Sequence, residues 1–161
     1  MSLSHLNENG EVHMVDISTK KCSARMARAC CSVIFPAGRL DSIMKKGIKK
    51  GDLFAAARIA GIQAAKQTPD IIPLAHPISL DWAEIKLQAV PEENKIEVES
   101  VVKASDATGV EMEALNAASA AALTIYDMCK SESKNINITN MHLEEKKGGN
   151  SGHWKAEANS S

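Results

Sequence analysis

The sequence contains few aromatic residues and no excess of either charge. Phenylalanine, tyrosine and tryptophan make up 3% of the chain, which leaves few side chains on which the bases of single-stranded nucleic acid can stack. The 19 lysines and arginines nearly balance the 20 aspartates and glutamates, so the net charge of −1 gives no global attraction to nucleic acid or to an acidic membrane. We therefore expect neither partner, and any anion site must be local.

The sequence also lacks long apolar runs and cysteine motifs. No stretch approaches the roughly 20 apolar residues that span a membrane, and residues 1–13 show no basic segment followed by an apolar one. We therefore expect a cytoplasmic protein. The 4 cysteines include no CxxC pair, which favours reduced, mostly buried thiols over disulfides. The histidines show no short ligand spacing, so we expect no metal site.

What the chain does contain is 44% hydrophobic residues, enough for one domain over residues 1–161. We expect its ends, about 1–12 and 147–161, to be flexible. Segments with the pattern of strands cover residues 22–35, 80–89, 95–103 and 135–143. Segments with the pattern of helices cover residues 38–48, 53–67 and 108–130. This order predicts an α+β fold, a ferredoxin-like βαββαβ plan with an additional helix in the first crossover and an antiparallel sheet packed by helices.

Two residues of the helix over 53–67 have specific expected roles. Asp52 precedes its first apolar residue and suits the N-cap position. Gly61 lowers the helix propensity and permits a close approach of another backbone. The next segment, residues 70–79, contains Pro73 and Pro77 and is expected to be a stiff loop.

The Ala-rich helix over 108–130 carries a polar stripe. If Thr108 is its N-cap, Glu111 follows at the spacing of a capping box. At about 100° per residue, the stripe contains Glu113, Asn116, Ala120, Thr124, Asp127 and Ser131, with Lys130 beside it. Because the other faces are apolar, this stripe must meet water, a polar partner or a ligand.

Asp127 and Lys130 admit two interpretations. They can form an ordinary exposed ion pair, which contributes only a few tenths of a kcal/mol. Alternatively, the apolar surroundings of the stripe place the pair beside a cleft. There burial adjusts both pKa values, the aspartate acts as a base, and the lysine holds an anion or transfers a proton.

Three other segments are candidate binding elements. His76 lies between Pro73 and Pro77, which restrict its backbone, although a lone histidine is more often structural. Lys49 and Lys50 precede a helix N-terminus and make a local positive feature suited to phosphate. Residues 149–152, GNSG, can wrap a phosphate or simply be flexible.

Four segments together resemble a known family. They are HMVDIS at 13–18, KKGDLFAAARIAGIQAAK at 49–66, IIPLAHP at 71–77 and TGVEMEALNAASAAALTIYDMCK at 108–130. In this order they closely resemble cyclic pyranopterin monophosphate synthase, the molybdenum cofactor biosynthesis protein C family. The resemblance implies a lyase that converts the small molecule 3′,8-cyclo-7,8-dihydroguanosine 5′-triphosphate to cyclic pyranopterin monophosphate and diphosphate. It also implies a homohexamer, a trimer of dimers with active sites between subunits, and no cofactor beyond a Mg²⁺ ion associated with the triphosphate substrate.

The resemblance also implies roles for individual residues. Those matching catalytic positions are Asp127, Lys130, Lys50 and His76. Those matching substrate contacts are Leu74, Ala75, His76, Met112 and Glu113, with Arg25 and Lys146 as triphosphate contacts and Glu111 shared between substrate and capping box. The chain departs from the family at residues 20–48, which are distinctive, and at Asn150, where relatives can carry a basic residue.

Two other functions remain open at this point. A ferredoxin-like module can bind a small anionic ligand between subunits without catalysis, because this fold hosts many functions. A metallohydrolase is a weaker alternative, since the sequence offers no clear ligand set.

Overall fold

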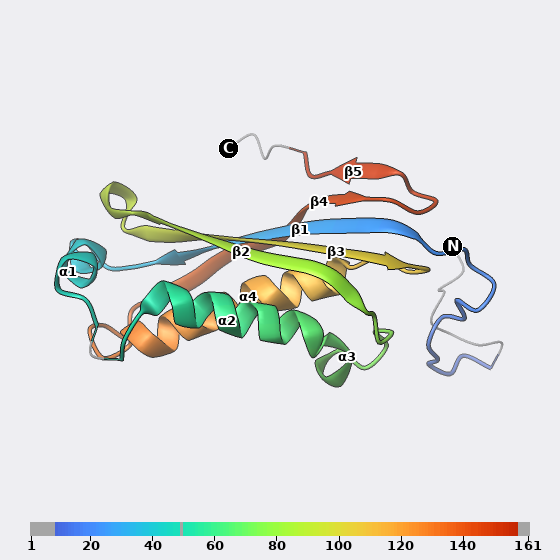
Figure 1. Ribbon diagram of the computed structural model, residues 1–161. Helices are drawn as coiled ribbons and strands as arrows, with labels where there is room; N and C mark the ends of the chain where they lie inside the picture. Colours follow the sequence, from blue (N-terminus) through green and yellow to red (C-terminus); the bar gives the residue numbers. More distant parts are fainter. Residues whose placement is uncertain (1–8, 49, 158–161) are drawn as a thin grey trace.

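The computed structural model describes residues 9–48 and 50–157 (Figure 1). Lys49 and the outermost parts of the expected flexible ends lie outside these residues. The strands are β1 (Ser23–Ile34), β2 (Leu80–Val90), β3 (Lys95–Asp106), β4 (Asn137–Lys147) and β5 (His153–Lys155). The helices are α1 (Arg39–Lys46), α2 (Leu53–Lys66), α3 (Thr68–Ile71) and α4 (Glu111–Cys129), and the turn η1 (Pro91–Glu93) joins β2 to β3.

The strands form one antiparallel sheet in the order β2-β3-β1-β4-β5. Helices α2 and α4 lie side by side on one face of this sheet, and the other face is not covered by a helix (Figure 1). The first four strands have the order and direction of the expected ferredoxin-like fold, with α1 as the additional helix of the first crossover. The sequence patterns did not predict α3 or the edge strand β5.

The core follows from alternation along β1. Ala27, Ala29 and Val33 are fully buried, whereas the intervening Arg28 and Cys30 reach the uncovered face. On α4, the small residues Ala114, Ala117, Ala118, Ala121 and Ala122 are likewise fully buried. Such small side chains bring the helix axis close to its neighbours. As expected, the four cysteines are free thiols, but only Cys31 and Cys129 are buried, whereas Cys22 is exposed and Cys30 is half-buried.

At Gly61, α2 lies very close to both α4 and β2. A Cβ atom there would lie 2.8 Å from Ile85 Cγ1 and 2.9 Å from the Ala117 carbonyl oxygen. Both distances are shorter than a normal van der Waals contact. The sequence expectation of a close backbone approach is therefore confirmed, and only glycine fits without displacing α4.

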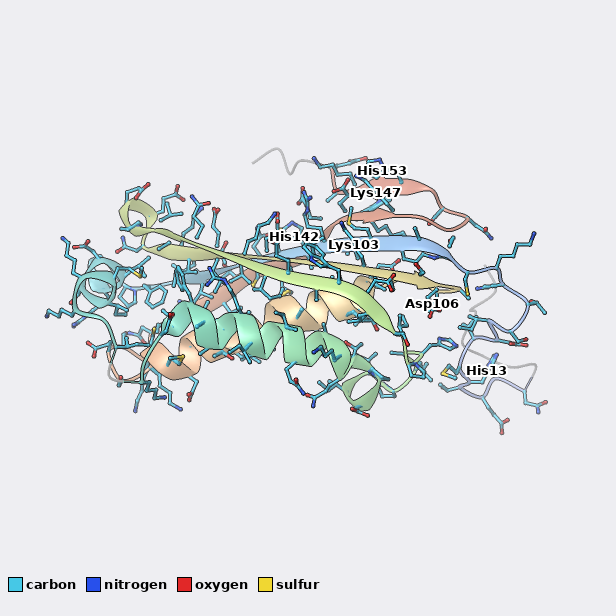
Figure 2. All side chains as sticks on the ribbon, viewed as in Figure 1. His13, Lys103, Asp106, His142, Lys147 and His153 are labelled. Carbon is cyan, nitrogen blue, oxygen red and sulfur yellow. The ribbon has the colours of Figure 1, made fainter. Side chains whose placement is uncertain are left out.

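The two main helices begin differently. At α2, the Asp52 side chain accepts a hydrogen bond from Ala55 N at 3.0 Å, which confirms the expected N-cap. At α4, the expected capping box is wrong, because the helix begins at Glu111 after Val110 and has no side-chain cap. Asp106, at the end of β3 (Figure 2), instead accepts hydrogen bonds from the amides of Ala107 and Thr108. Thr108 therefore belongs to the connecting loop.

Replacing Gly61 tests the packing between α2 and α4. Gly61→Ala raises intrinsic helix propensity by about 1 kcal/mol, yet we expect it to destabilise the protein by about 1–3 kcal/mol because its Cβ overpacks the contact. Chemical denaturation measures the change. Ile59→Ala, at a side chain 69% exposed on the same helix, is the control and should have a smaller effect. A stabilised Gly61→Ala variant would contradict the packing described.

Candidate active site

The carboxylate of Asp127 is held by two lysines from different parts of the chain. Lys130, one turn further along at the end of α4, places Nζ 2.6 Å from Asp127 Oδ1. Lys50, in the connection between α1 and α2, donates to Asp127 Oδ2 at 2.9 Å and to the Asp127 carbonyl oxygen at 2.7 Å. Folding thus brings together three residues that the resemblance marks as catalytic, although 77 positions separate Lys50 from Asp127.

The two lysines determine the protonation state of Asp127. The hydrogen bond from Lys130, followed by that from Lys50, lowers the pKa of Asp127 to about 2. The Asp127 side chain is 58% exposed, so the shift comes from the lysines and not from burial. The expectation that burial adjusts this pKa is therefore wrong. Lys50 and Lys130 are 45% and 52% exposed, so the described residues leave the pair open to solvent. Asp127 is a fully ionised carboxylate that can accept a proton once a lysine moves away.

A separate cavity of about 370 Å³ lies at the other end of α4. It is lined by residues of the 74–78 loop, the start of α4 and the N-terminal arm. It brings together Leu74, Ala75 and His76 with Glu111, Met112 and Glu113, as the resemblance implies for substrate contacts. Val15 and Ile17 complete the wall, so the arm at 13–18 adopts no regular strand but contributes to the cavity.

His76 is oriented by the same arm. Its Nε2 lies 2.8 Å from the carbonyl oxygen of Val15. Because a carbonyl only accepts, Nε2 must carry the hydrogen and donate, which leaves Nδ1 as the acceptor of a neutral ring. The ring can therefore accept a proton at Nδ1 without losing the contact that positions it.

Glu113 is a buried carboxyl group with one unpartnered oxygen. The residue is 2% exposed, and its Oε2 is buried without a partner. Burial raises the pKa of Glu113 to about 7, and the nearby carboxylate of Glu111 adds to the shift. Glu113 is also one of the residues that line the cavity, and an unsatisfied polar group at such a place is suited to a hydrogen bond from a ligand.

A larger cavity of about 840 Å³ adjoins the first. Both are lined by Lys20, Thr108, Gly109 and Glu111. The larger one adds the positively charged groups Lys21, Arg25 and Lys146, together with Gly149, Asn150 and Ser151 of the β4–β5 loop. Four cationic side chains around one cavity make a local anion site on a chain with almost no net charge. We call it the anion cavity.

The cationic groups of the anion cavity are held in place. Arg25 donates from Nε to the Asp106 carbonyl oxygen at 3.1 Å and from Nη2 to that of Ala107 at 3.0 Å. Lys146 Nζ lies 2.7 Å from Glu111 Oε1. This ion pair explains why Glu111 does not take part in a capping box at the start of α4, because its carboxylate is paired with Lys146. Arg25 and Lys146, which the resemblance implies as triphosphate contacts, line the same cavity, and Asn150 lines it too.

The two groups of candidate residues do not meet within one chain. Fourteen positions separate Glu113 from Asp127, and a rise of about 1.5 Å per residue places them about 21 Å apart along α4. Figure 1 shows the same separation, with the α1–α2 connection and the end of α4 on one side and α3 with the start of α4 on the other. Asp127, Lys130 and Lys50 therefore form one half-site, and His76, Glu113 and the anion cavity form another.

Sequence reasoning missed several residues that line these cavities. Lys20 and Lys21 contribute to the anion cavity, and only their closeness to Arg25 in sequence could have suggested this. On the stripe of α4, Asn116 donates to the Ala64 carbonyl oxygen at 2.8 Å and so joins α4 to α2. The stripe is thus partly structural, and the candidate functional residues lie at its two ends.

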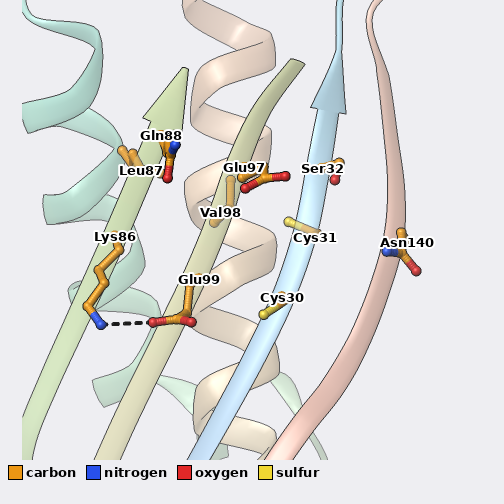
Figure 3. Close-up of a pocket in the computed structure, with 10 residues that line it drawn as sticks. All are labelled: Cys30, Cys31, Ser32, Lys86, Leu87, Gln88, Glu97, Val98, Glu99 and Asn140. Carbon is orange, nitrogen blue, oxygen red and sulfur yellow. Dashed lines mark hydrogen bonds and ion pairs between the residues drawn. The ribbon is translucent and has the colours of Figure 1, made fainter. Parts of the chain in front are cut away.

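The uncovered face of the sheet has a hollow of about 510 Å³ (Figure 3). Its lysine, Lys86, is paired with Glu99 at 3.0 Å. Burial, followed by the charge of Glu99, raises the pKa of Cys30 to about 11, so this thiol stays protonated and is a poor nucleophile. The hollow contains none of the residues implied by the resemblance, and we do not assign it a reaction.

Neither metal binding nor membrane insertion is supported by the residues that the structure describes. Within 9–48 and 50–157, no three His, Cys, Asp or Glu side chains are grouped so that they can hold a metal ion. The helices found there are all too short or too polar to cross a membrane.

The raised pKa of Glu113 makes a prediction about stability. The pKa of this carboxyl group is near 4.5 in the unfolded chain and about 7 in the folded protein. The folded protein therefore loses stability as the pH rises from about 4.5 to about 7. We expect Glu113→Gln to unfold with a similar free energy at pH 5 and to be more stable than the unmodified protein at pH 8. Denaturation at both pH values measures this. An equal difference at the two pH values would contradict the burial of an ionisable group.

Comparison with known families adds an independent finding to this geometry. The sequence profile described as MoaC family matches residues 14–149. The match includes β1 through β4, Lys50, Asp127 and Lys130, and the residues between Val15 and Gly149 that line the two cavities. The chain therefore belongs to the MoaC family, and its role lies in the biosynthesis of the molybdenum cofactor.

Proposed function

We propose that this chain, acting as a single domain, is a cyclic pyranopterin monophosphate synthase. It converts 3′,8-cyclo-7,8-dihydroguanosine 5′-triphosphate to cyclic pyranopterin monophosphate and diphosphate. The observation that carries the proposal is the convergence of Lys50 and Lys130 on the Asp127 carboxylate. The cavity with the unpaired Glu113 carboxyl and the adjoining anion cavity support a substrate that has both a polar ring and a chain of phosphates.

The ring chemistry requires groups that move protons. Opening the five-membered nitrogen ring and closing a pterin ring both need proton transfer to and from nitrogen and carbon atoms. Lys50 and Lys130 keep Asp127 ionised in the empty protein. When the anionic substrate attracts these lysines, the carboxylate loses its hydrogen bonds, its pKa rises, and it becomes a stronger base. His76, which can accept at Nδ1, is the second proton carrier.

The phosphate chemistry requires positive charge. A ribose oxygen forms a bond to the α-phosphorus, its proton passes to a base, and the bond from that phosphorus to the diphosphate breaks. Lys50 and Lys130 neutralise the charge that develops on the phosphoryl oxygens. Arg25 and Lys146 hold the departing diphosphate in the anion cavity. A Mg²⁺ ion carried by the triphosphate belongs to the substrate, and the proposal assigns no cofactor to the chain.

The complete site is proposed to form between two copies of the chain. The outward side of α4 exposes Met112 and Leu123, which are 38% and 60% exposed. Ala120 lies midway between Glu113 and Asp127, so two α4 helices packed antiparallel around Ala120 would place each Asp127 beside the other copy's Glu113. A small residue at the midpoint permits close helix packing. Three such dimers make the proposed hexamer.

The catalytic proposal is tested by turnover of the cyclised nucleotide. Diphosphate release and pterin formation should both occur with purified protein. Asp127→Asn and Lys130→Ala should each lower the rate at least ~10²-fold because general acid–base catalysis is lost. Asp41→Asn is the matched control, since Asp41 forms a comparable exposed ion pair with Lys45 at 2.7 Å outside both half-sites.

The same experiment addresses the competing function. A non-catalytic module would bind the nucleotide without consuming it, and that result with the unmodified protein would overturn the proposed reaction. Loss of activity after rigorous chelation, restored by a transition metal and not by Mg²⁺, would instead support a metallohydrolase.

The shared site makes a second prediction. Asp127→Asn and His76→Ala chains should each be inactive alone, but co-expressed chains should recover activity because a mixed dimer has one site with both residues intact. Random pairing of equal amounts gives about a quarter of the full activity. Steady-state rates of the purified mixture measure the recovery.

A matched pair distinguishes true complementation from a trivial effect. Asp127→Asn co-expressed with Lys130→Ala should recover nothing, because both residues belong to the same half-site. If the first mixture also stays inactive while both chains co-assemble, the complete site does not lie between chains.

A further inference from the structure

The loop that precedes strand β5 forms part of the wall of the anion cavity. Gly149, Asn150 and Ser151 of this loop line the cavity together with Lys20 and Lys21. The loop lies directly against β1, since a Cβ atom at Gly149 would clash with the Arg25 guanidinium and one at Gly148 with the Ala24 carbonyl oxygen. Gly148 and Gly149 have positive φ values, of 98° and 73° respectively, which other residues rarely adopt. Any shift of this loop therefore changes the space around Arg25.

Little apolar packing holds β5 to the sheet. Its three residues, His153–Lys155, are all exposed. Backbone hydrogen bonds fix its ends, from Gly148 N to the Gly152 carbonyl oxygen and from Ala156 N to that of Glu144, both at 2.9 Å. Between these ends β5 pairs with Glu145, Lys146 and Lys147 of β4, but an exposed edge strand with only three paired residues is held weakly unless side chains add to the pairing.

One side-chain contact adds to the backbone pairing between β5 and β4. His153 Nε2 lies 2.7 Å from Glu145 Oε1, on the neighbouring strand β4. Glu145 is only 7% exposed, and it is also contacted by Lys147 at 3.0 Å and by Arg28 at 3.6 Å. Hydrogen bonds from Lys147 and His153 lower the pKa of Glu145, so it is ionised. Figure 2 shows His153 and Lys147 together at the β4–β5 edge.

We propose that His153 is a positioning residue for the anion cavity: its bond to Glu145 anchors β5 and thereby fixes the loop that closes on Arg25. Along β4, Glu145 and Lys147 point to one face and the intervening Lys146 points to the other, toward Glu111 and the cavity. The anchor and the cavity thus lie on opposite faces of the same strand. His153 contacts no cavity residue itself and acts through the backbone.

The contact with Lys147 makes His153 a clean target for mutation. If His153 is removed, Glu145 keeps Lys147 and Arg28 as partners, so no buried charge is left unpaired and folding should be retained. His142 is a matched control, because its Nε2 lies 3.1 Å from Glu144 Oε2 on β4 and it anchors no loop of the cavity.

Calorimetric titration with inorganic tripolyphosphate tests the inference on the full chain. We expect His153→Ala to raise the Kd for tripolyphosphate at least about threefold. This is the effect expected if part of the free energy of a charged hydrogen bond is lost and the loop around Arg25 shifts. His153→Gln, which retains a donor, should restore most of the affinity, and His142→Ala should bind like the unmodified protein. In turnover assays, His153→Ala should raise KM while leaving kcat nearly unchanged.

The identity of the anion as a triphosphate rests on the proposed function, and the outcomes separate the two. Unchanged tripolyphosphate affinity in His153→Ala, with Arg25→Ala strongly weakened, overturns the role of His153 alone. Unchanged affinity in Arg25→Ala overturns the anion cavity and the inference together. If His153→Ala weakens tripolyphosphate binding while the unmodified protein does not convert the cyclised nucleotide, the role of His153 stands and the proposed reaction is overturned.

Discussion

The close packing of α4 between α2 and the sheet fixes the positions of the candidate residues at its two ends. Gly61 leaves no room for a side chain against Ala117, and the buried alanines of α4 keep the helix near β1 and β3. A helix held this closely along its length cannot tilt or slide. Its two ends are therefore rigid supports, one for Asp127 and Lys130 and the other for Glu113 and the cavities.

The two carboxyl groups at these ends have opposite environments. Two lysines lower the pKa of Asp127 to about 2, whereas burial raises that of Glu113 to about 7. Groups whose environments move their pKa values apart are suited to different steps of one acid–base reaction. In the empty protein Glu113 can donate or accept a hydrogen bond near neutral pH, and Asp127 can only accept. This division agrees with a ring-recognition role for Glu113 and a proton-transfer role for Asp127.

Much of this arrangement could be predicted from the sequence. Alternation identified β1, β2 and β3, Asp52 marked the start of α2, and Gly61 indicated the close approach, because each depends on local chemistry. The capping box at Thr108 was wrong because two other groups compete for its members: the neighbouring Asp106 accepts from the loop amides, and the distant Lys146 pairs with Glu111. The expected burial of Asp127 also failed, since exposure depends on which other segments cover the end of α4. Sequence could not show that Lys50 joins Asp127 while His76 joins Glu113, because these contacts depend on how the loops fold against the two ends of α4.

The central claim is that a complete site requires the two ends of α4 from different copies of the chain. The most direct test is a structure of the assembled protein with a bound substrate analogue. The account predicts that the Asp127 carboxylate of one copy lies within reach of the ligand held by the second copy's His76 and Glu113, with roughly 10 Å or less between the carboxyl groups. A ligand bound by His76 and Glu113 with every Asp127 about 20 Å away or more, the separation set by the length of α4, would contradict it.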